Sequence, residues 1–378
     1  MLWVFCLTFR GTVRVRGGRD TLKIIFAGGG TAGHVNPALA LAELMREGNE
    51  ILFVGTPKGM EETLVPKAGF DIKYIDVLGL RRRISFQNVR AFFKVFKAFA
   101  QSKKIIREFK PDVVIGTGGY VAGPLLYAAA RMKIPTLIHE QNVFAGLTSK
   151  ILQKYVDVVA ISFKESEQYF TKAKKLVYTG NILRSELFDV NRKQAVDDLG
   201  IDNKPMVLAF GGSLGAEGFN DAVVKFIKDT SGRYNILFST GERYYEDIVK
   251  ELNGIDTDRI KIKKYIHNMQ VAMNAADIVI ARAGAITVSE LTALGKPSVL
   301  VPSPNVTNNH QEYNARALEK CGAAIVILER ELAECGLTET VNNLFENVVQ
   351  LVEMSESALS IGVRDGAKQV IKLIEDLV

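Results

Sequence analysis

The chain contains the same local arrangement twice: an apolar strand that ends in a glycine-rich turn and continues into a helix. The first copy reads IIFAGGGTAGHVNPALALAELM over 24–45, and the second reads PMVLAFGGSLGAEGFNDAVVKFI over 205–227. Short β-branched runs alternate with helical patterns after each copy, which is the order of a parallel sheet covered by helices on both faces. We therefore expect an α/β protein with two doubly wound, Rossmann-like domains that face one another across a cleft.

The predicted strands form two series, in agreement with a length of 378 residues, which suggests two domains. The polar stretch TGNILRSELFDVNRKQAVDDLG separates them. We assign 22–184 to an N-terminal domain and 185–360 to a C-terminal domain, expect 1–21 to be a disordered extension, and expect a last helix in 361–378 that can pack back on the N-terminal domain. The strands are predicted at 23–27, 51–55, 113–116, 136–139, 156–161 and 176–178, then after 205 and at 235–239, 260–263, 278–281, 298–301 and 324–327, and helices at 37–47, 89–109 and 123–132.

The net charge of +6 is concentrated in two segments. Residues 81–110 hold ten Lys and Arg with one acid, and residues 1–20 hold four Arg with one Asp, so the remaining 328 residues carry a charge of −6. This distribution argues against a general nucleic-acid-binding surface. The three cysteines have no CxxC spacing, so neither a disulfide framework nor a zinc knuckle is expected.

The first glycine turn has the Gly28-x-Gly30-x-x-Gly33 spacing of a dinucleotide-binding turn. Dinucleotide binding also requires an acid at the end of the second strand, to bind a ribose hydroxyl. The second strand here ends at Gly55, and the next acid is Glu61. We therefore disfavour a nicotinamide site and expect the turn to bind another phosphate through its backbone amides, the alternative being a tight turn without a ligand.

His34 follows this turn at the start of a helix. A neutral imidazole beside a bound anion can take a proton from an attacking hydroxyl at neutral pH. The alternative, which the sequence leaves equally open, is a residue that only hydrogen-bonds the loop.

The second half contains ARAGAITVSELTALGKPSVLVPSP over 281–304. A strand is expected to end at Arg282, and Gly284 to turn the chain into a helix whose first turns hold Thr287, Ser289 and Glu290. Free amides and hydroxyls there can bind phosphate, and Glu290 can accept two bonds from ribose hydroxyls. A Thr or Ser cap followed by Glu is the alternative explanation.

Seven motifs in this order resemble those of the MurG family, whose members have the two-domain GT-B fold. They are GGGTAGHVNPALALA, GTGGYVAGP, HEQNVFAGLTSK, TGNILR, FGGSLGAEGFN, ARAGAITVSEL and NNHQEYNA, and the similarity runs from about Leu22 to the C-terminus. The resemblance implies inverting transfer of GlcNAc from UDP-GlcNAc to the 4-hydroxyl of undecaprenyl-diphosphate-MurNAc-pentapeptide (lipid I), giving lipid II and UDP. It implies a role in peptidoglycan synthesis, cell shape and cell division at the cytoplasmic face of the membrane, with cell-wall synthesis proteins as possible partners and no cofactor.

The resemblance also implies which residues bind the substrates. The Ile266 backbone would bind uracil, Glu290 the ribose and Gln311 the GlcNAc hydroxyls. The full set for UDP-GlcNAc is Thr31, Ala32, Gly33, Asn142, Arg184, Ser213, Ile266, Ala285, Ile286, Thr287, Val288, Ser289, Glu290 and Gln311. The loops facing the acceptor diphosphate would hold Gly30, His34, Gly118, Gly119 and Tyr120. Two positions depart from the family pattern, because Ala32 replaces a glycine and the proline usual before Arg184 is absent.

Inverting transfer needs a base and relief of the charge on departing UDP. His34 is the first candidate base, and Glu140 is the second, unless Glu140 only orients a neighbouring loop. The single Asp-x-Asp, at 256–258, lies in a polar turn and is expected to be solvated. We therefore expect no metal, with helix N-termini and Arg184 stabilising the leaving group.

The basic segment GLRRRISFQNVRAFFKVFKAFAQSKKIIREFK interleaves cations with phenylalanines. Such a segment suits the surface of an anionic membrane, whereas the alternative is that the phenylalanines only face the core. The predicted peripheral membrane patch comprises Leu80, Arg81, Arg82, Arg83, Ile84, Phe86, Arg90, Phe93, Lys94 and Lys97.

Three other functions remain open from the residues alone. A GT-B enzyme acting on another lipid would share the nucleotide chemistry, and a nucleotide-sugar-binding protein without turnover would share the pocket. A UDP-GlcNAc epimerase would also have two Rossmann domains, but it would have no use for the basic aromatic segment.

Overall fold

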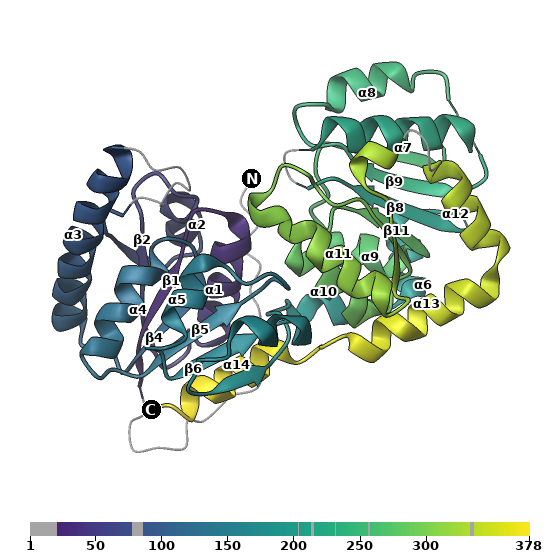
Figure 1. The fold of residues 1–378 in the computed structure, drawn as a ribbon. Helices are drawn as coiled ribbons and strands as arrows, with labels where there is room; N and C mark the ends of the chain where they lie inside the picture. Colours follow the sequence, from purple (N-terminus) through teal and green to yellow (C-terminus); the bar gives the residue numbers. More distant parts are fainter. Residues whose placement is uncertain are drawn as a thin grey trace.

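The structure is a computed structural model with two α/β domains (Figure 1). It describes residues 21–77, 86–202, 204–212, 215–230, 232–255, 258–332 and 336–378, and within 86–95 it describes the backbone alone. The predicted extension lies almost entirely outside the described residues.

The N-terminal domain has a seven-stranded parallel sheet in the order β3-β2-β1-β4-β5-β6-β7. The order reverses between β1 and β4, so the loops that follow these two strands lie side by side at the carboxyl edge, where doubly wound sheets bind ligands. The strands are β1 Lys23–Gly28, β2 Glu50–Gly55, β3 Asp71–Tyr74, β4 Val113–Gly118, β5 Thr136–Glu140, β6 Val158–Ile161 and β7 Leu176–Tyr178.

The central strands of this sheet are buried on both sides, because helices cover both of its faces. Phe26 of β1 stacks on Phe53 of β2, with ring centroids 5.5 Å apart. The helices are α1 Ala32–Leu44, α2 Glu61–Lys67, α3 Phe86–Phe109, α4 Ala122–Arg131, α5 Leu147–Leu152 and the short η1 Lys164–Tyr169.

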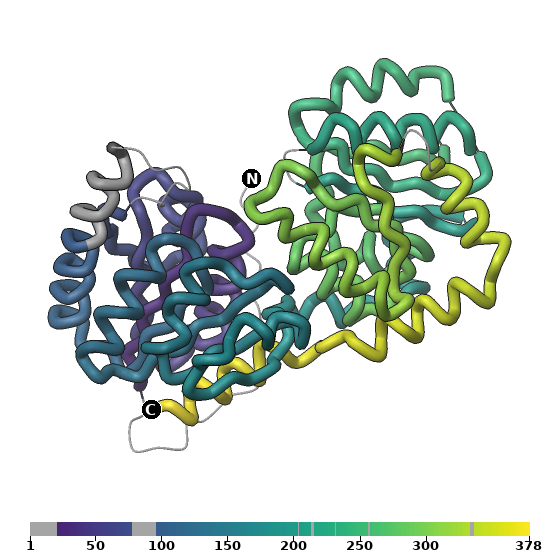
Figure 2. Tube along the Cα trace, viewed as in Figure 1, coloured from purple at the N-terminus to yellow at the C-terminus, as the bar shows by residue number. Residues whose placement is uncertain are grey.

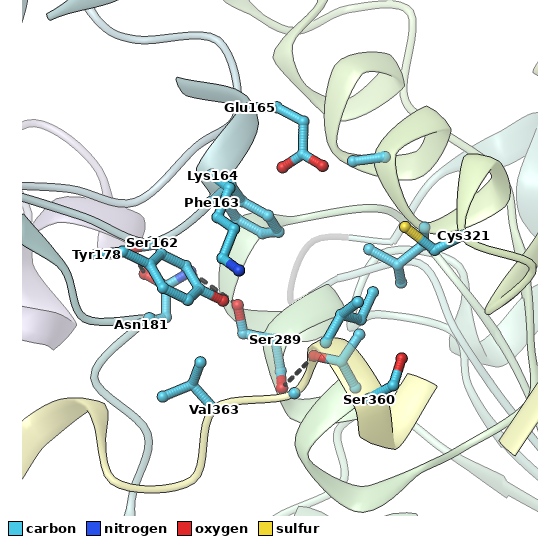
Figure 3. Close-up of a pocket in the computed structure, with 16 residues that line it drawn as sticks. Ser162, Phe163, Lys164, Glu165, Tyr178, Asn181, Ser289, Cys321, Ser360 and Val363 are labelled. Atoms are coloured by element: carbon cyan, nitrogen blue, oxygen red, sulfur yellow. Dashed lines mark hydrogen bonds between the residues drawn. The ribbon is translucent and has the colours of Figure 1, made fainter. Parts of the chain in front are cut away.

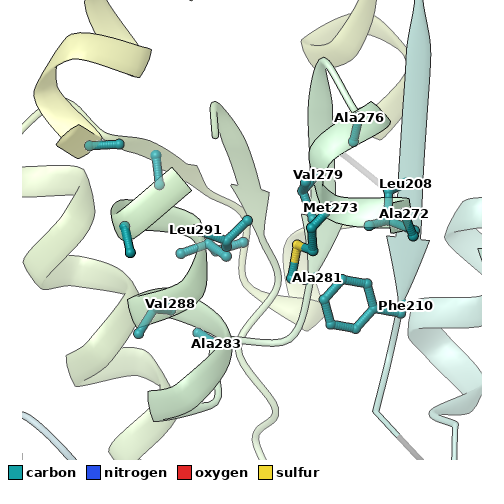
Figure 4. Close-up of a cluster of buried hydrophobic side chains, with 14 of the residues drawn as sticks. Leu208, Phe210, Ala272, Met273, Ala276, Val279, Ala281, Ala283, Val288 and Leu291 are labelled. Atoms are coloured by element: carbon teal, nitrogen blue, oxygen red, sulfur yellow. The ribbon is translucent and has the colours of Figure 1, made fainter. Parts of the chain in front are cut away.

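The C-terminal domain repeats the same topology with six parallel strands in the order β10-β9-β8-β11-β12-β13. Small side chains such as Ala272, Ala281 and Ala283 let its helices pack close to the sheet, with Phe210 filling the space beside them (Figure 4). The strands are β8 Met206–Phe210, β9 Asn235–Ser239, β10 Ile260–Lys263, β11 Ile278–Ala281, β12 Ser298–Leu300 and β13 Ala324–Val326. The helices are η2 Ser185–Phe188, α6 Arg192–Leu199, α7 Glu217–Asp229, α8 Tyr245–Glu251, α9 Met269–Ala275, α10 Ala285–Leu294, η3 Thr307–Asn309, α11 His310–Lys320, η4 Glu329–Glu331, α12 Leu337–Glu346 and α13 Val348–Ile361.

The main chain passes between the domains twice. At the first crossing, Ile182 belongs to the core of the N-terminal domain and the next residue, Leu183, to the core of the C-terminal domain. At the second, α13 lies on the C-terminal domain, and α14 (Gly366–Glu375) returns to bury Val370 and Ile374 against the N-terminal sheet (Figure 2). The crossings touch, because a Cβ at Gly180 would lie 2.5 Å from the Val363 Cβ.

Besides shifts of one to three residues at other element ends, three details differ from the elements expected from sequence. The edge strand β3 was not predicted, helix α1 begins at Ala32 instead of 37, and α13 ends at Ile361, so that α14 begins only at Gly366. The earlier start of α1 matters most, since it makes His34 the third residue of the helix.

Candidate active site

Two glycine loops of the N-terminal domain meet at the carboxyl edge of β1 and β4. Gly118 and Gly119 have positive φ angles of 112° and 81°, which favour glycine, and a Cβ on Gly119 would lie 2.3 Å from the Gly29 carbonyl oxygen. The two predicted acceptor loops therefore form one continuous surface. Tyr120, at its border, is 59% exposed.

His34 lies between these loops. Its ring packs on the backbone of Gly118, where a Cβ would come within 2.5 Å of the His34 Nδ1 atom. Nδ1 is 3.3 Å from Oε1 of Gln141, and the His34 carbonyl accepts a 2.6 Å hydrogen bond from Thr117. Thr31 caps α1 through its backbone carbonyl alone, and a Cβ at Gly33 would lie 3.8 Å from the Thr31 Oγ1 atom, an ordinary van der Waals distance. His34 is thus held in place while its ring stays partly exposed.

Glu61, the first acid after the second strand, lies buried beneath the first glycine turn. Its Oε2 accepts a 2.9 Å bond from the Gly30 amide, and its Oε1 accepts bonds from the Thr56 amide and hydroxyl at 2.9 and 2.7 Å. Burial raises the pKa of Glu61, but the bonds from Thr56 and Gly30 together outweigh it and lower the pKa below its usual value. The Gly30 amide, in one of the loops predicted to face the acceptor diphosphate, is therefore already bonded to a carboxylate.

The loop after β5 connects the two domains. Glu140 Oε1 accepts from the Asn142 amide at 3.2 Å and its Oε2 from the Gly146 amide at 3.0 Å, so this carboxylate holds the loop in shape. From α11, the Asn314 side chain accepts from the Val143 amide at 3.0 Å and donates to Asn142 Oδ1 at 3.3 Å. Glu140 thus has the bonding expected of a loop-orienting residue, and Asn142 lies at the domain junction.

Helix α10 presents its N-terminal turn on the opposite side of the junction. Gly284 precedes it without a side-chain cap, and within the described part of the chain the amides of Ala285, Ile286 and Thr287 have no hydrogen-bond partner. Val288 is buried in the domain core. The predicted capping alternative is therefore not what the helix adopts.

Ser289, which the family resemblance implies in donor binding, accepts a hydrogen bond from the other domain. Asn181 Nδ2 donates to Ser289 Oγ at 2.8 Å and approaches the Ala285 carbonyl at 3.3 Å. The Ser289 side chain is therefore used to join the domains. Asn181 was not among the predicted site residues, although it stands in the TGNILR motif.

Glu290 and Arg184 lie near one another at this junction. Burial raises the pKa of Glu290 to about 7, with the positive charge of Arg184 acting in the opposite direction. Since the chain continues from Leu183 directly into the C-terminal domain, Arg184 stays close to α10 without the proline usual at this position in the family. A carboxyl group that is half ionised near neutral pH and lies beside a cation can, in its ionised form, accept hydrogen bonds from the hydroxyls of a ligand.

Ile266 and Gln311, which are also predicted to bind UDP-GlcNAc, lie on the C-terminal domain. Among the described residues, the backbone N–H and carbonyl of buried Ile266 have no hydrogen-bond partner, so both are available to a base edge. Gln311 Oε1 accepts from the Ser303 amide at 2.9 Å, which leaves the amide hydrogens of Gln311 for other partners. The preceding Asn308 and Asn309 have φ angles of 60° and 54°, a costly conformation that turns the chain sharply into α11.

A cavity of about 240 Å³ lies at the domain junction, beside Ser289 and Thr292 of α10 (Figure 3). Ser162, Lys164 and Tyr178 line it from the N-terminal domain, and Cys321 and Ser360 from the C-terminal half. Ser289 is its one wall residue from the predicted site, so this cavity is separate from the surface formed by the glycine loops.

Some predicted residues lie outside the described part of the chain. These are Ser213, Leu80, Arg81, Arg82, Arg83 and Ile84, and the side chains of Phe86, Arg90, Phe93 and Lys94 are not described either. Lys97 is described and forms a 3.4 Å ion pair with Asp76, next to Phe96, which is 59% exposed. Within the described residues, no helix has the length and apolarity to cross a membrane, and no group of three or more His, Cys, Asp or Glu side chains gathers as metal ligands would.

Two facing Rossmann-like domains with glycine turns at the switch points of their sheets form the GT-B fold. The chain belongs to glycosyltransferase family 28, whose N-terminal domain matches residues 24–161 and whose C-terminal domain matches residues 206–370.

The chain is 49% identical over 362 residues to the UDP-N-acetylglucosamine--N-acetylmuramyl-(pentapeptide) pyrophosphoryl-undecaprenol N-acetylglucosamine transferase of Acetivibrio thermocellus, covering 94% of this chain and 98% of the relative. The crystal structure of Acinetobacter baumannii MurG superposes with a TM-score of 0.75 at 31% identity, over 94% of this chain and 99% of that one. A UDP-GlcNAc 2-epimerase from Neisseria meningitidis, crystallised with UDP-GlcNAc, shares the fold at a TM-score of 0.65 with 14% identity, over 94% and 100% of the two chains.

Proposed function

We infer that this protein transfers N-acetylglucosamine from UDP-GlcNAc to the 4-hydroxyl of lipid-linked N-acetylmuramoyl-pentapeptide, giving lipid II and UDP in peptidoglycan synthesis. The observation that carries this inference is the 49% identity to a transferase of that name along both domains, end to end. The epimerase alternative has only the fold in its favour, at 14% identity.

We propose that His34 is the base of this reaction. The imidazole is fixed by Gly118 and Gln141 at the surface of the two acceptor loops, where a sugar hydroxyl would approach. In the transfer, the hydroxyl gives its proton to His34, its oxygen forms the bond to C1 of GlcNAc, and the C1–O bond to UDP breaks with its electron pair leaving on UDP. Glu140 is disfavoured as the base, since both of its oxygens accept bonds from loop amides.

We propose that the donor lies against the C-terminal domain. The free first turn of α10 suits the diphosphate, the unpaired Ile266 backbone suits the uracil, and Glu290 suits the ribose. Arg184 and the helix end would offset the charge that develops on UDP, which is a mechanism without a metal. Thr31, Ala32, Gly33 and Asn142 would close the pocket from the N-terminal domain.

We also propose that the segment containing Leu80 to Lys97 holds the enzyme on the cytoplasmic face of an anionic membrane. The local excess of cations and the exposed Phe96 support this assignment, and so does a lipid-linked acceptor.

The decisive experiment measures UDP release from UDP-GlcNAc by the purified protein, with and without a soluble lipid I analogue and in the presence of EDTA. Acceptor-dependent release that survives EDTA is expected. Release that requires added metal would contradict the proposed leaving-group stabilisation. UDP release at the same rate with and without the lipid I analogue would contradict the transferase assignment. An epimerised sugar formed without the analogue would favour the epimerase.

A further inference from the structure

A chain of hydrogen bonds runs from His34 into the interior of the N-terminal domain. His34 Nδ1 lies 3.3 Å from Gln141 Oε1, Gln141 Nε2 lies 3.0 Å from His139 Nδ1, and His139 Nε2 lies 3.1 Å from the Gly180 carbonyl oxygen. His139 and Gln141 are buried, so the polar groups of these two side chains depend on these partners instead of water.

The inner end of this chain determines the tautomer of His139. The Gly180 carbonyl can only accept a hydrogen bond, so the proton of His139 must be on Nε2. Ser162 agrees with this arrangement: its hydroxyl hydrogen faces two acceptors, the Glu140 carbonyl at 2.8 Å and Asn181 Oδ1 at 2.9 Å, so it offers a lone pair to His139 Nε2 at 3.3 Å. Burial lowers the pKa of His139, which keeps the ring neutral and its Nδ1 an acceptor.

The acceptors around Gln141 fix the orientation of its side-chain amide. The Nε2 group donates to His139 Nδ1 and to the His139 carbonyl, both at 3.0 Å, which accounts for its two hydrogens. Rotating the amide by a half turn would place Oε1 against both acceptors. The oxygen of Gln141 therefore faces His34, and an oxygen at this position requires a proton on His34 Nδ1.

We propose that Gln141 is a positioning residue, whose side-chain amide holds His34 in the Nδ1–H tautomer and leaves the Nε2 lone pair free to take the acceptor proton. The proposal rests on the proposed role of His34 as the base. Once protonated at Nε2, His34 still donates from Nδ1 to Gln141, so the bond persists through the transfer. The Gly180 carbonyl at the domain crossing thus determines, through the side chains of His139 and Gln141, which nitrogen of His34 can act.

The test uses the full chain labelled with ¹⁵N-histidine, because four histidines give few signals to assign. Long-range ¹H–¹⁵N correlation spectra at pH 8 distinguish the two tautomers, and single His→Gln variants assign them. The wild-type protein should have His34 protonated on Nδ1 and His139 on Nε2. A wild-type His34 protonated on Nε2 would overturn the proposal, whether or not any variant folds.

A substitution then links the tautomer to turnover. In Gln141→Met the His34 signal should shift toward the Nε2–H form, and kcat should fall about 10- to 100-fold while the KM for UDP-GlcNAc changes less than about twofold. Gln153→Met is the matched control, since Gln153 is also buried in this domain and bonds the Lys150 and Tyr169 carbonyls. It should lower stability and leave the His34 tautomer and kcat unchanged.

Two results separate this proposal from the proposed function. An unchanged His34 tautomer and kcat in Gln141→Met would overturn the role of Gln141 while leaving the transferase intact. A wild-type protein without acceptor-dependent transfer would contradict the function itself, independently of the spectrum.

Discussion

The side-chain amide of Asn181 in the N-terminal domain donates a 2.8 Å hydrogen bond to the Ser289 hydroxyl on helix α10 of the C-terminal domain. The same amide group reaches the Gln141 carbonyl at 3.1 Å, and Asn181 Oδ1 accepts from Ser162 at 2.9 Å. One buried side chain therefore joins the loop that carries Gln141 to the helix proposed to bind the diphosphate.

Asn181→Ala should lower the stability of the protein. The change leaves buried partners in both domains unsatisfied, at a cost of about 2 kcal/mol. We expect a decrease in Tm of about 4 °C or more, measured by thermal unfolding. Asn253→Ala, at an exposed position, is the control and should leave Tm unchanged. Equal Tm values for Asn181→Ala and Asn253→Ala would argue that Asn181 does not hold the domains together.

Glu61→Gln should weaken the first glycine turn in a pH-dependent way. The pKa of Glu61 is lowered in the folded protein, so its carboxylate contributes stability above about pH 4.5, and this contribution is lost as the pH falls below that value. We expect the variant to have a lower Tm than the wild type at pH 7, and the difference to shrink toward pH 3. Glu62→Gln, at the exposed neighbour, is the control. A difference in Tm that is constant with pH would mean that the charge of Glu61 is unimportant.

Binding of UDP-GlcNAc should strengthen as the pH rises from 6 to 8. Burial raises the pKa of Glu290 to about 7, so the carboxylate that can accept bonds from ribose hydroxyls becomes the main form only above that pH. Titration calorimetry should show a Kd about tenfold lower at pH 8 than at pH 6. UDP-GlcNAc is the suitable ligand because its diphosphate is a diester that does not titrate in this range.

Glu290→Gln is the matched variant for that experiment. It should bind more weakly than the wild type at pH 8 and with an affinity that does not depend on pH. A pH dependence that survives the substitution would assign the titration to another group.

His34→Gln should remove turnover while preserving donor binding. Loss of a general base costs about 10²- to 10⁴-fold in rate, and we expect kcat to fall within that range. The Kd for UDP-GlcNAc, measured by calorimetry, should stay within about twofold of the wild type. His267→Gln serves as the control, because His267 is exposed. Substantial activity in His34→Gln would exclude His34 as the base.

Replacing Arg81, Arg82 and Arg83 by Gln should weaken binding to anionic vesicles. Each cation near such a surface contributes about 1 kcal/mol, so the triple variant should lose about 100-fold in vesicle affinity at low salt. Co-sedimentation with phosphatidylglycerol vesicles measures this effect. Replacing the exposed Lys172, Lys175 and Lys193 by Gln removes the same charge elsewhere and should have little effect. Equal losses in both variants would indicate attraction by net charge alone.

The two-domain fold could be predicted from the sequence because its buried parallel strands are continuous apolar runs. Strand β3 escaped prediction because it is a four-residue edge strand with mostly exposed side chains, which leaves only a weak pattern. The early start of α1 was obscured by Gly33 and Pro37, which usually lie outside helices.

The local structure of the candidate site was predictable where a motif carries it: a helix follows the glycine turn before His34, and α10 follows Gly284. The roles of Glu61, Gln141 and Asn181 could not be predicted, because each depends on partners brought together by the tertiary structure. Glu61 bonds a turn 31 residues earlier in the chain, and Asn181 bonds a helix 108 residues later. No local spacing encodes either contact.

The double crossing of the main chain limits how the two domains can move. The crossings, at Ile182–Leu183 and at 362–366, lie against each other where Val363 touches Gly180. Two adjacent covalent connections act as a hinge. Opening and closing of the domains about this hinge is compatible with both connections, whereas sliding or twisting would strain both. Such opening and closing would change the distance between the domains and keep the glycine turn before His34 opposite the first turn of α10 from one turnover to the next.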